Sequence, residues 1–271
     1  MKRILIMSGI LLWSALAAAE EIKVPYVKLE NDFFAKPDPK AQEWNTIETT
    51  NISMLPQNIT MPSLKEATIK NLSIQTLHNN KWIAIKLVWK DPTKNVHVES
   101  SEASDACAVQ FPFGEAAKTS PFMGNKGAMV AILHWKGIWQ NDIEKGYQQV
   151  KDLHPNTWVD TYRFGIQAAI DKKNPIAQPD RKTPVEELFA EGFGTLTTQP
   201  KQNATGSGVW ENGEWNVVLA RPLKSGDKND PPLKAGSQTS LAFALWDGAA
   251  QNVGSRKNYA PWVPLILEKN R

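Results

Sequence analysis

The residue types that could carry out chemistry in this chain are few and far apart. The four histidines are His78, His97, His134 and His154, and no two of them have the close spacing of a helical metal motif. The single cysteine, Cys107, cannot form an internal disulfide, complete a four-cysteine metal site or belong to a C-x-x-C-H haem attachment motif. The sequence also lacks G-x-S-x-G, H-E-x-x-H, a P-loop and G-x-G-x-x-G. It therefore indicates none of the common catalytic constellations.

Most of these residues have an ordinary structural explanation. His78 lies in a predicted turn and His97 near a strand end, so both are expected to be solvated. His134 alternates with apolar neighbours on a predicted strand, which favours a satisfied core or edge histidine over a metal ligand. Cys107 lies in an apolar strand-like stretch and is expected to be a small buried residue rather than a reactive thiol.

Two loops contain residues that could meet a ligand. Residues 121–127 place Met123 in a tight loop beside Gly124, just before a predicted strand. Residues 254–259 contain Arg256 and Lys257 after the strand end at 243–249. Taken one at a time, a methionine is usually core filler and a loop lysine is usually solvated. Neither loop predicts a site by itself.

The eleven tryptophans offer a second route to a function. Most are expected to pack in the core or along its edge. Flat aromatic rings can also form a platform for sugars, so a carbohydrate-binding β-sandwich module is the alternative function. Several tryptophans fall in predicted strands: Trp82, Trp89, Trp135, Trp210, Trp215 and Trp246.

The elements that must position these loops are short strands separated by turns. The strongest local pattern is 208–221, where Asn212-Gly213 supplies the two residues of a type I′ hairpin turn between Trp210 and Trp215. This pattern, with little helix, predicts an all-β fold: an antiparallel β-sandwich with long loops and short helical excursions. Further strands are expected at 67–77, 81–89, 106–113, 128–135, 240–246 and 262–268, with a helical or irregular segment at 140–153, a surface excursion at 170–187 and a helical turn at Glu186–Phe189.

The N-terminus predicts export. Lys2 and Arg3 precede an apolar run, and Ala17-Ala18-Ala19 gives a small-residue cleavage site, so residues 1–19 form a signal peptide. The predicted domains are this signal, an irregular arm at 20–60 and one sandwich domain at 61–271. Removing two basic residues lowers the formal net charge from +3 to +1, which gives no electrostatic footprint for nucleic acid. No second long apolar run is present, so no membrane span is expected in the mature chain.

Several short segments of the sequence, called marks below, resemble in their order along the chain the haem b-binding gamma subunits of type II dimethyl-sulfoxide-reductase-family molybdoenzymes. That family includes the small subunits of ethylbenzene dehydrogenase, dimethylsulfide dehydrogenase, chlorate and selenate reductases and nitrite oxidoreductase. Each mark is weak alone, but together they span roughly residues 100–268. The marks are Phe122-Met123-Gly124, Leu153-His154-Pro155 to Asp160-x-Tyr162, Trp210 to Pro222, Ala244 to Gly248, and Arg256-Lys257 before Trp262.

The resemblance implies one non-covalent haem b whose iron is ligated by Met123 and Lys257. A thioether is a soft neutral ligand, and a lysine ligates only as the neutral amine, so burial must lower its pKa. Lys126 is the competing lysine, but Lys257 is preferred because a haem plane would have to pass between Lys126 and Met123. Arg256 could pair with a haem propionate or form a surface salt bridge.

The resemblance also implies the setting. The chain would be a non-catalytic, periplasmic electron-transfer subunit in a heterotrimer with a molybdenum catalytic subunit and an iron–sulfur subunit. Its haem would link the iron–sulfur clusters to a soluble cytochrome c. The sequence does not identify the substrate of the whole enzyme or the direction of electron flow.

Overall fold

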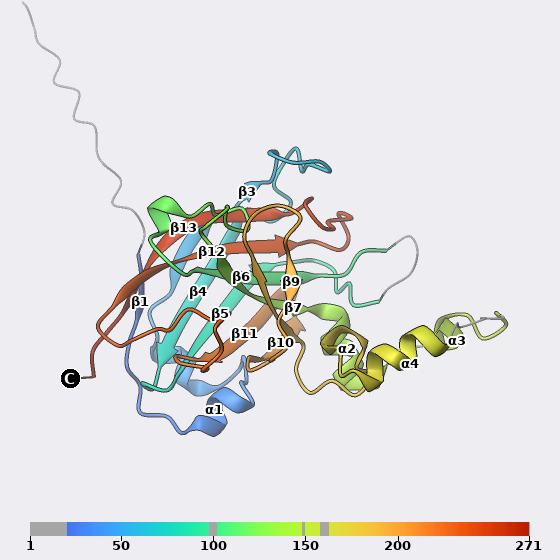
Figure 1. Ribbon diagram of the computed structural model, residues 1–271, viewed down its shortest axis with the longest axis horizontal. Coiled ribbons are helices and arrows are strands. Elements are labelled where there is room, and N and C mark those ends of the chain that lie inside the picture. Colours follow the sequence, from blue (N-terminus) through green and yellow to red (C-terminus); the bar gives the residue numbers. More distant parts are fainter. Residues whose placement is uncertain (1–20, 98–101, 148–149, 158–162, 271) are drawn as a thin grey trace, which may run out of the picture.

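The protein is a sandwich of two β-sheets (Figure 1). The computed structural model describes residues 21–97, 102–147, 150–157 and 163–270. The first sheet has eight strands in the order β1-β13-β12-β6-β7-β8-β9, with β3 paired to β13. Its strands are β1 Ile22–Val24, β3 Leu55–Pro56, β6 Ala106–Pro112, β7 Val130–Lys136, β8 Val185–Ala190, β9 Thr197–Thr198, β12 Gln238–Trp246 and β13 Asn258–Leu267.

The second sheet has five strands in the order β10-β11-β5-β4-β2. Its pairs are antiparallel, and only the β1–β13 pair of the first sheet runs parallel. The predicted all-β sandwich is therefore confirmed. The strands of the second sheet are β2 Thr50–Ser53, β4 Asn71–His78, β5 Trp82–Lys90, β10 Thr205–Glu211 and β11 Glu214–Pro222.

The main core lies between the two sheets. Strand side chains alternate in direction, so each inner face supplies a row of apolar residues. Trp89 and Trp215 from one sheet meet Trp135 from the other, with ring centroids 4.9 to 6.4 Å apart. Cys107 is buried in this core, as predicted.

The β10–β11 hairpin forms where the sequence places it. Asn212 and Gly213 have φ values of 52° and 77°, the left-handed conformations that a type I′ turn requires. Trp210 pairs with Trp215 across the strands. The turn and the hairpin register are both confirmed.

Gly213→Ala is expected to destabilise the protein by about 1 kcal/mol, because alanine resists a φ of 77°. No atom lies close enough to clash with an added Cβ, since the nearest is 3.9 Å away. Chemical denaturation should therefore show a lower midpoint with an unchanged slope. An unchanged midpoint would contradict this account of the turn.

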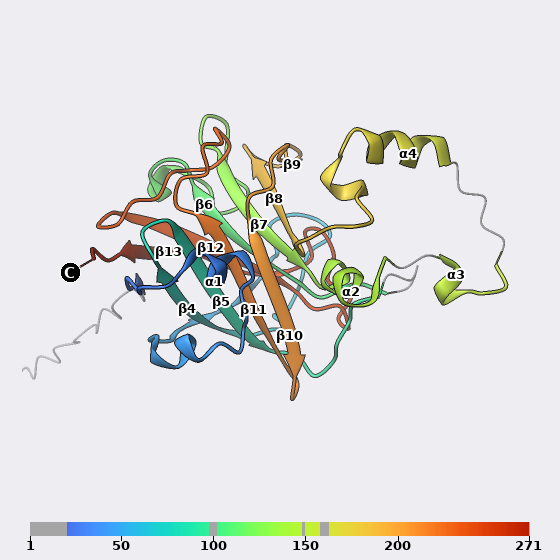
Figure 2. The same cartoon turned by 90° about the horizontal axis from the view of Figure 1, so that it is seen from below.

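The described part of the predicted arm, residues 21–60, is not irregular, contrary to the prediction. These residues supply β1, β2 and β3 to the sheets, and they also form α1 Asn31–Ala35 and the 3₁₀ helix Gln42–Thr46. Phe34 and Trp44 are buried on the outer face of the five-stranded sheet, against Leu77 and Val218. Figure 2 shows α1, the helix that carries Phe34, beside β5 of this sheet. The alternation was weak because these strands are short and pair with distant partners.

Two further predictions were wrong. Residues 186–189 form part of strand β8 rather than a helical turn, and both of its glutamates accept hydrogen bonds there. Glu186 accepts from Thr198 at 2.6 Å, and Glu187 accepts from the Ala204 amide at 3.0 Å. His78 is buried rather than solvated. Its Nδ1 accepts from the Asn80 amide, which leaves Nε2 to donate to the Glu268 carbonyl at 3.0 Å.

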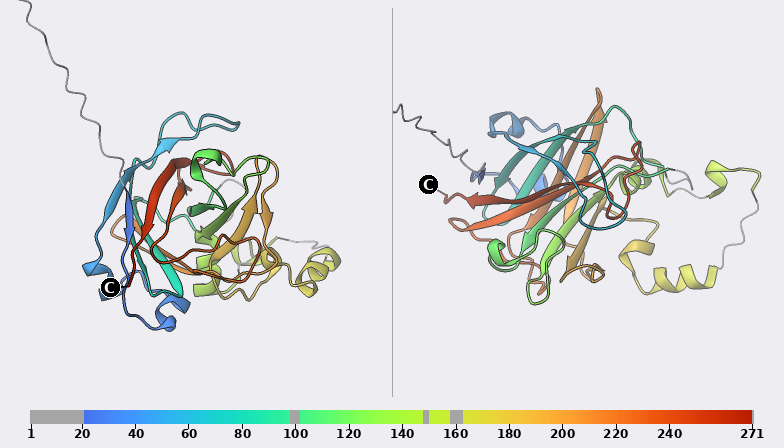
Figure 3. Two further views of the ribbon diagram at one scale, coloured as in Figure 1. Left: turned by 60° about the vertical axis from the view of Figure 1, so that its left-hand side comes forward. Right: turned by 90° about the horizontal axis from the view of Figure 1, so that it is seen from above.

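The helical excursions lie beside the sandwich. The segment bearing α4 extends to one side of the strands in both views of Figure 3. None of the helices within the described ranges is long and apolar enough to cross a membrane. The signal at 1–19 and the marks Asp160 and Tyr162 lie outside the described residues. The remaining helices are α2 Gly137–Lys145, α3 Val150–Leu153, α4 Arg163–Asp171 and the 3₁₀ turns Ala116–Lys118 and Pro175–Ala177.

Candidate functional site: an apolar cavity on the outer sheet face

The eight-stranded sheet buries side chains on both of its faces. Its outer face carries a second apolar cluster that includes Ala108, Ile132 and Leu188. Loops cover this cluster incompletely and leave a cavity of about 600 Å³. A volume of this size falls within the range of about 300–1,000 Å³ that is usual for ligand and cofactor sites.

The floor of the cavity is built from rows of cross-strand neighbours. Ala244, Ala108 and His134 are aligned across β12, β6 and β7 in one row. Ala242, Gln110 and Ile132 form the next row. Because three of these six side chains are small alanine methyl groups, the floor leaves room for a flat, largely apolar ligand.

Met123 reaches the cavity from the loop between β6 and β7. Its φ is +62°, which is uncommon for a residue with a side chain and is often found at functional sites. The Gly192 amide donates to the Met123 carbonyl at 2.8 Å, and the Gly124 amide donates to the Ser120 carbonyl at 3.0 Å. The backbone therefore holds Met123 in this conformation.

Lys257 reaches the same cavity from the segment that precedes β13. The Gln57 amide donates to the Lys257 carbonyl at 3.0 Å, and the Gln57 side chain donates to the Ser255 carbonyl at 2.7 Å. Trp246 Nε1 donates to the Gly254 carbonyl at 3.0 Å. The end of β12 and residue 57 thus fix the loop that carries Lys257.

The Lys257 amine is poorly solvated and lacks a carboxylate partner. Nζ lies 5.1 Å from the centroid of the Trp246 ring, and no ion pair or hydrogen bond of this amine occurs among the residues described. Burial lowers the pKa of Lys257 from 10.5 to about 8. A larger fraction of this amine is therefore neutral near pH 7 than for an ordinary lysine.

His134 belongs to the cavity, although the sequence favoured a satisfied histidine. Its Nε2 is buried without a hydrogen-bond partner within the part of the chain that the structure describes. Its ring lies 5.0 Å from the Trp246 ring. Burial, with the nearby positive charges of Lys136 and Lys257, holds the pKa of His134 well below 6.5. The alternation that placed His134 on a strand could not show which face would carry a cavity.

The other two predicted basic residues do not line the cavity. Lys126 is exposed, three residues beyond Met123. Arg256 is half-buried next to Lys257, and it is not among the residues that border the cavity. The structure thus brings Met123 and Lys257 to one cavity and leaves Lys126 outside it.

Comparison with known proteins bears on this site. A model of the ethylbenzene dehydrogenase family matches residues 41–258. The chain belongs to the ethylbenzene dehydrogenase family. This match covers both cavity loops. The predicted resemblance to the gamma subunits of this group of enzymes is therefore confirmed.

Three relatives align over most of this family member. The chlorate reductase subunit gamma of Ideonella dechloratans is 25% identical and covers 79% of this chain and 72% of its own. A putative respiratory nitrate reductase heme subunit of Haloferax mediterranei is 22% identical over 90% of this chain and 72% of its own. The dimethylsulfide dehydrogenase subunit gamma of Rhodovulum sulfidophilum is 22% identical over 90% and 80%.

Among solved structures, a family 9 carbohydrate-binding module from Caldicellulosiruptor kristjanssonii in complex with cellotriose is similar. It has a TM-score of 0.45 and 9% identity, and the alignment covers 93% of this chain and 95% of that one. Four of the tryptophans are at most 1% exposed, so these four cannot stack against a sugar. They are Trp44, Trp89, Trp135 and Trp215.

Proposed function

We propose that this chain is the electron-transfer gamma subunit of a molybdoenzyme and binds one non-covalent haem b through Met123 and Lys257. The observation that carries the proposal is that both residues line one largely apolar cavity. They come from loops on different parts of the sheet, and neither is needed to fill the main core. The relatives support a gamma subunit, and one of them is named as a heme subunit.

The donor set suits haem iron. A thioether and a neutral amine are the two donors, and the lowered pKa of Lys257 reduces the cost of deprotonating its amine. Haem supplies a one-electron iron couple, and a methionine ligand favours the reduced form. The three alanines in the floor of the cavity leave room for a flat macrocycle. Arg256, next to Lys257 in the chain, is proposed to meet a propionate at the rim.

The partner subunits and the cellular location are proposed from the family to which the chain belongs. Gamma subunits of this kind imply a molybdenum catalytic subunit and an iron–sulfur subunit as partners. We propose that the haem passes electrons between the iron–sulfur subunit and a soluble cytochrome c. From the predicted signal peptide, we propose that this exchange takes place in the periplasm. The chain itself would carry out no substrate chemistry.

The test is a visible spectrum of the mature chain after export into a haem-supplied periplasm. The dithionite-reduced protein is expected to show the narrow α-band of low-spin haem b. Met123→Ala and Lys257→Ala should each weaken or shift this band. Lys126→Ala is the matched control, because it removes a nearby lysine that lies outside the cavity, and its spectrum should equal that of the wild type.

A colourless wild-type protein would overturn the haem proposal. A spectrum that Met123→Ala and Lys257→Ala leave unchanged would overturn the ligand assignment alone. Binding of soluble glycans that survives both substitutions would favour a carbohydrate-binding module.

A further inference from the structure

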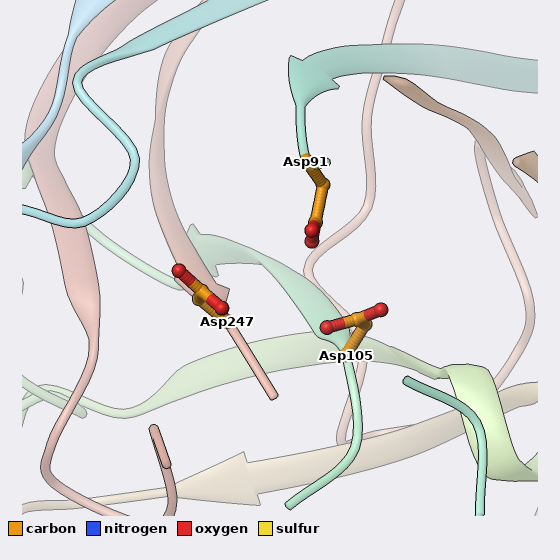
Figure 4. Close-up of side chains that lie close together, drawn as sticks. All are labelled: Asp91, Asp105 and Asp247. Atoms are coloured by element: carbon orange, nitrogen blue, oxygen red, sulfur yellow. The ribbon is translucent and has the colours of Figure 1, made fainter. Parts of the chain in front are cut away.

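Three aspartates meet where strands of both sheets end. Asp91 follows β5, Asp105 precedes β6 and Asp247 follows β12. One carboxylate oxygen of each lies within 4.8 Å of the others. Figure 4 shows the Asp91 carboxylate pointing toward the space between Asp105 and Asp247.

Asp105 is held rigidly by donors around it. Its Oδ1 accepts from the Gly248 amide at 2.8 Å. Its Oδ2 accepts from the Asn95 amide at 2.8 Å and from Trp215 Nε1 at 2.9 Å. The Asp247 carboxylate accepts from the Ala250 amide at 3.0 Å. Two of the three carboxylates therefore have fixed orientations.

Asp91 has a buried oxygen without a well-formed hydrogen bond among the described residues. The residue is 2% exposed, and its Oδ1 accepts from the Thr93 amide at 3.1 Å. Its Oδ2 is buried and has no hydrogen-bond partner among the described residues. The indole N–H of Trp89 faces this carboxylate and favours its charged form, but the two groups do not reach normal hydrogen-bond geometry. A buried, unsatisfied carboxylate oxygen costs free energy unless a partner is supplied.

The cluster also lacks a compensating positive charge. None of the ion pairs found within the described ranges includes Asp91, Asp105 or Asp247. Burial and, to a lesser extent, the charge of Asp91 together raise the pKa of Asp105 to about 7. Burial likewise raises the pKa of Asp91. Three carboxylates this close are costly without a cation or a proton between them.

We propose that Asp91, Asp105 and Asp247 bind a divalent cation, and that the cation is Ca²⁺. All the side-chain ligands are oxygens, which excludes the soft and nitrogen-rich sets preferred by copper and zinc. Ca²⁺ tolerates irregular oxygen geometry contributed by loops, whereas Mg²⁺ demands near-ideal octahedral geometry. The expected dissociation constant is about 10⁻⁴ M, as in extracellular modules.

This site would join the two sheets at one end of the haem cavity. The ligands come from β5 of one sheet and from β6 and β12 of the other. Asp105 also borders the cavity, and Asp247 precedes the loop that carries Lys257. The cation would therefore stabilise the sandwich and the base of that loop. This inference goes beyond the proposed haem function and does not depend on it.

The test is isothermal titration calorimetry of Ca²⁺ into the full mature protein after treatment with EGTA and removal of the chelator. One site per chain is expected, together with a rise in the unfolding temperature when Ca²⁺ is added. Asp247→Asn should weaken binding at least tenfold, and Asp91→Asn should do the same. Asp227→Asn is the matched control, since Asp227 is also half-buried and caps a loop amide, at 2.9 Å.

Absence of Ca²⁺ heat from the wild-type protein, with an unfolding temperature that Ca²⁺ leaves unchanged, would overturn the proposal. Full-strength binding by both Asp91→Asn and Asp247→Asn would overturn it as well. A stronger response to Mg²⁺ than to Ca²⁺ would overturn the choice of cation. The wild-type titration remains decisive even if a variant fails to fold. The haem spectrum is read separately, so failure of one proposal is distinguishable from failure of the other.

Discussion

Replacing Lys257 by leucine is expected to abolish low-spin haem binding and, at the same time, to stabilise the haem-free protein at neutral pH. The wild-type ammonium is held in a largely apolar cavity with no ion-pair partner among the described residues. Removing it should increase the free energy of unfolding by about 2 kcal/mol, a figure discounted for partial solvent access. Loss of function with gained stability is the pattern expected of a strained ligand site.

The pH dependence of this gain follows from the pKa of Lys257. The pKa is about 8 in the folded protein and 10.5 as the ordinary value, so the unfolded chain binds more protons between these limits. Wild-type stability should therefore rise with pH from about 8 to 10.5, relative to Lys257→Leu. Thermal unfolding of both haem-free proteins across this range measures the effect. Lys126→Leu is the control and should show neither change; equal stability of wild type and Lys257→Leu at every pH would contradict the account.

Gly124→Ala is expected to displace Met123 and to cost about 2–3 kcal/mol of stability. Gly124 has a φ of +72°, and an added Cβ would lie 2.5 Å from the Ala128 carbonyl oxygen and 3.2 Å from that of Ala190. Both neighbours are backbone atoms, so the loop itself must move. The reduced α-band should weaken or shift as Met123 leaves its position.

Gly127→Ala separates this effect from simple backbone strain. Gly127 has a φ of +79°, but no atom lies within 4 Å of its added Cβ. It should lose about 1 kcal/mol and keep the wild-type spectrum. Chemical denaturation and visible spectra of the two variants give the comparison. If Gly124→Ala retained a normal α-band, the loop would not control the position of Met123.

The features that sequence alone determined are those set by neighbours in the chain. Asn212-Gly213 fixes a type I′ turn because it supplies two left-handed residues, and the alternation on each side fixes the hairpin. Alternating apolar residues likewise predicted β5 and β7 to within a residue or two of their bounds. These signals are local, so they survive without any tertiary information.

Strands that form only by pairing with distant parts of the chain could not be predicted from the sequence. β1 becomes a strand by pairing with β13, more than two hundred residues away, and its three residues show too little pattern to predict. β8 contains Glu186 and Glu187, in a segment predicted to form a short helical turn. Both are buried on the strand instead, where Thr198 of β9 donates to Glu186 and the Ala204 amide donates to Glu187.

The residues of the candidate sites could also be predicted only in part from the sequence. A resemblance singled out Met123 and Lys257, but only the folded sheet shows that both border one cavity. His134 was placed on a strand by its alternation, yet its Nε2 is buried on the outer face with no hydrogen-bond partner among the residues that the structure describes. Asp91, Asp105 and Asp247 gave no signal at all. Stacking of the two sheets brings their strand ends together, and the spacing of the three aspartates along the chain does not predict that they are close in space.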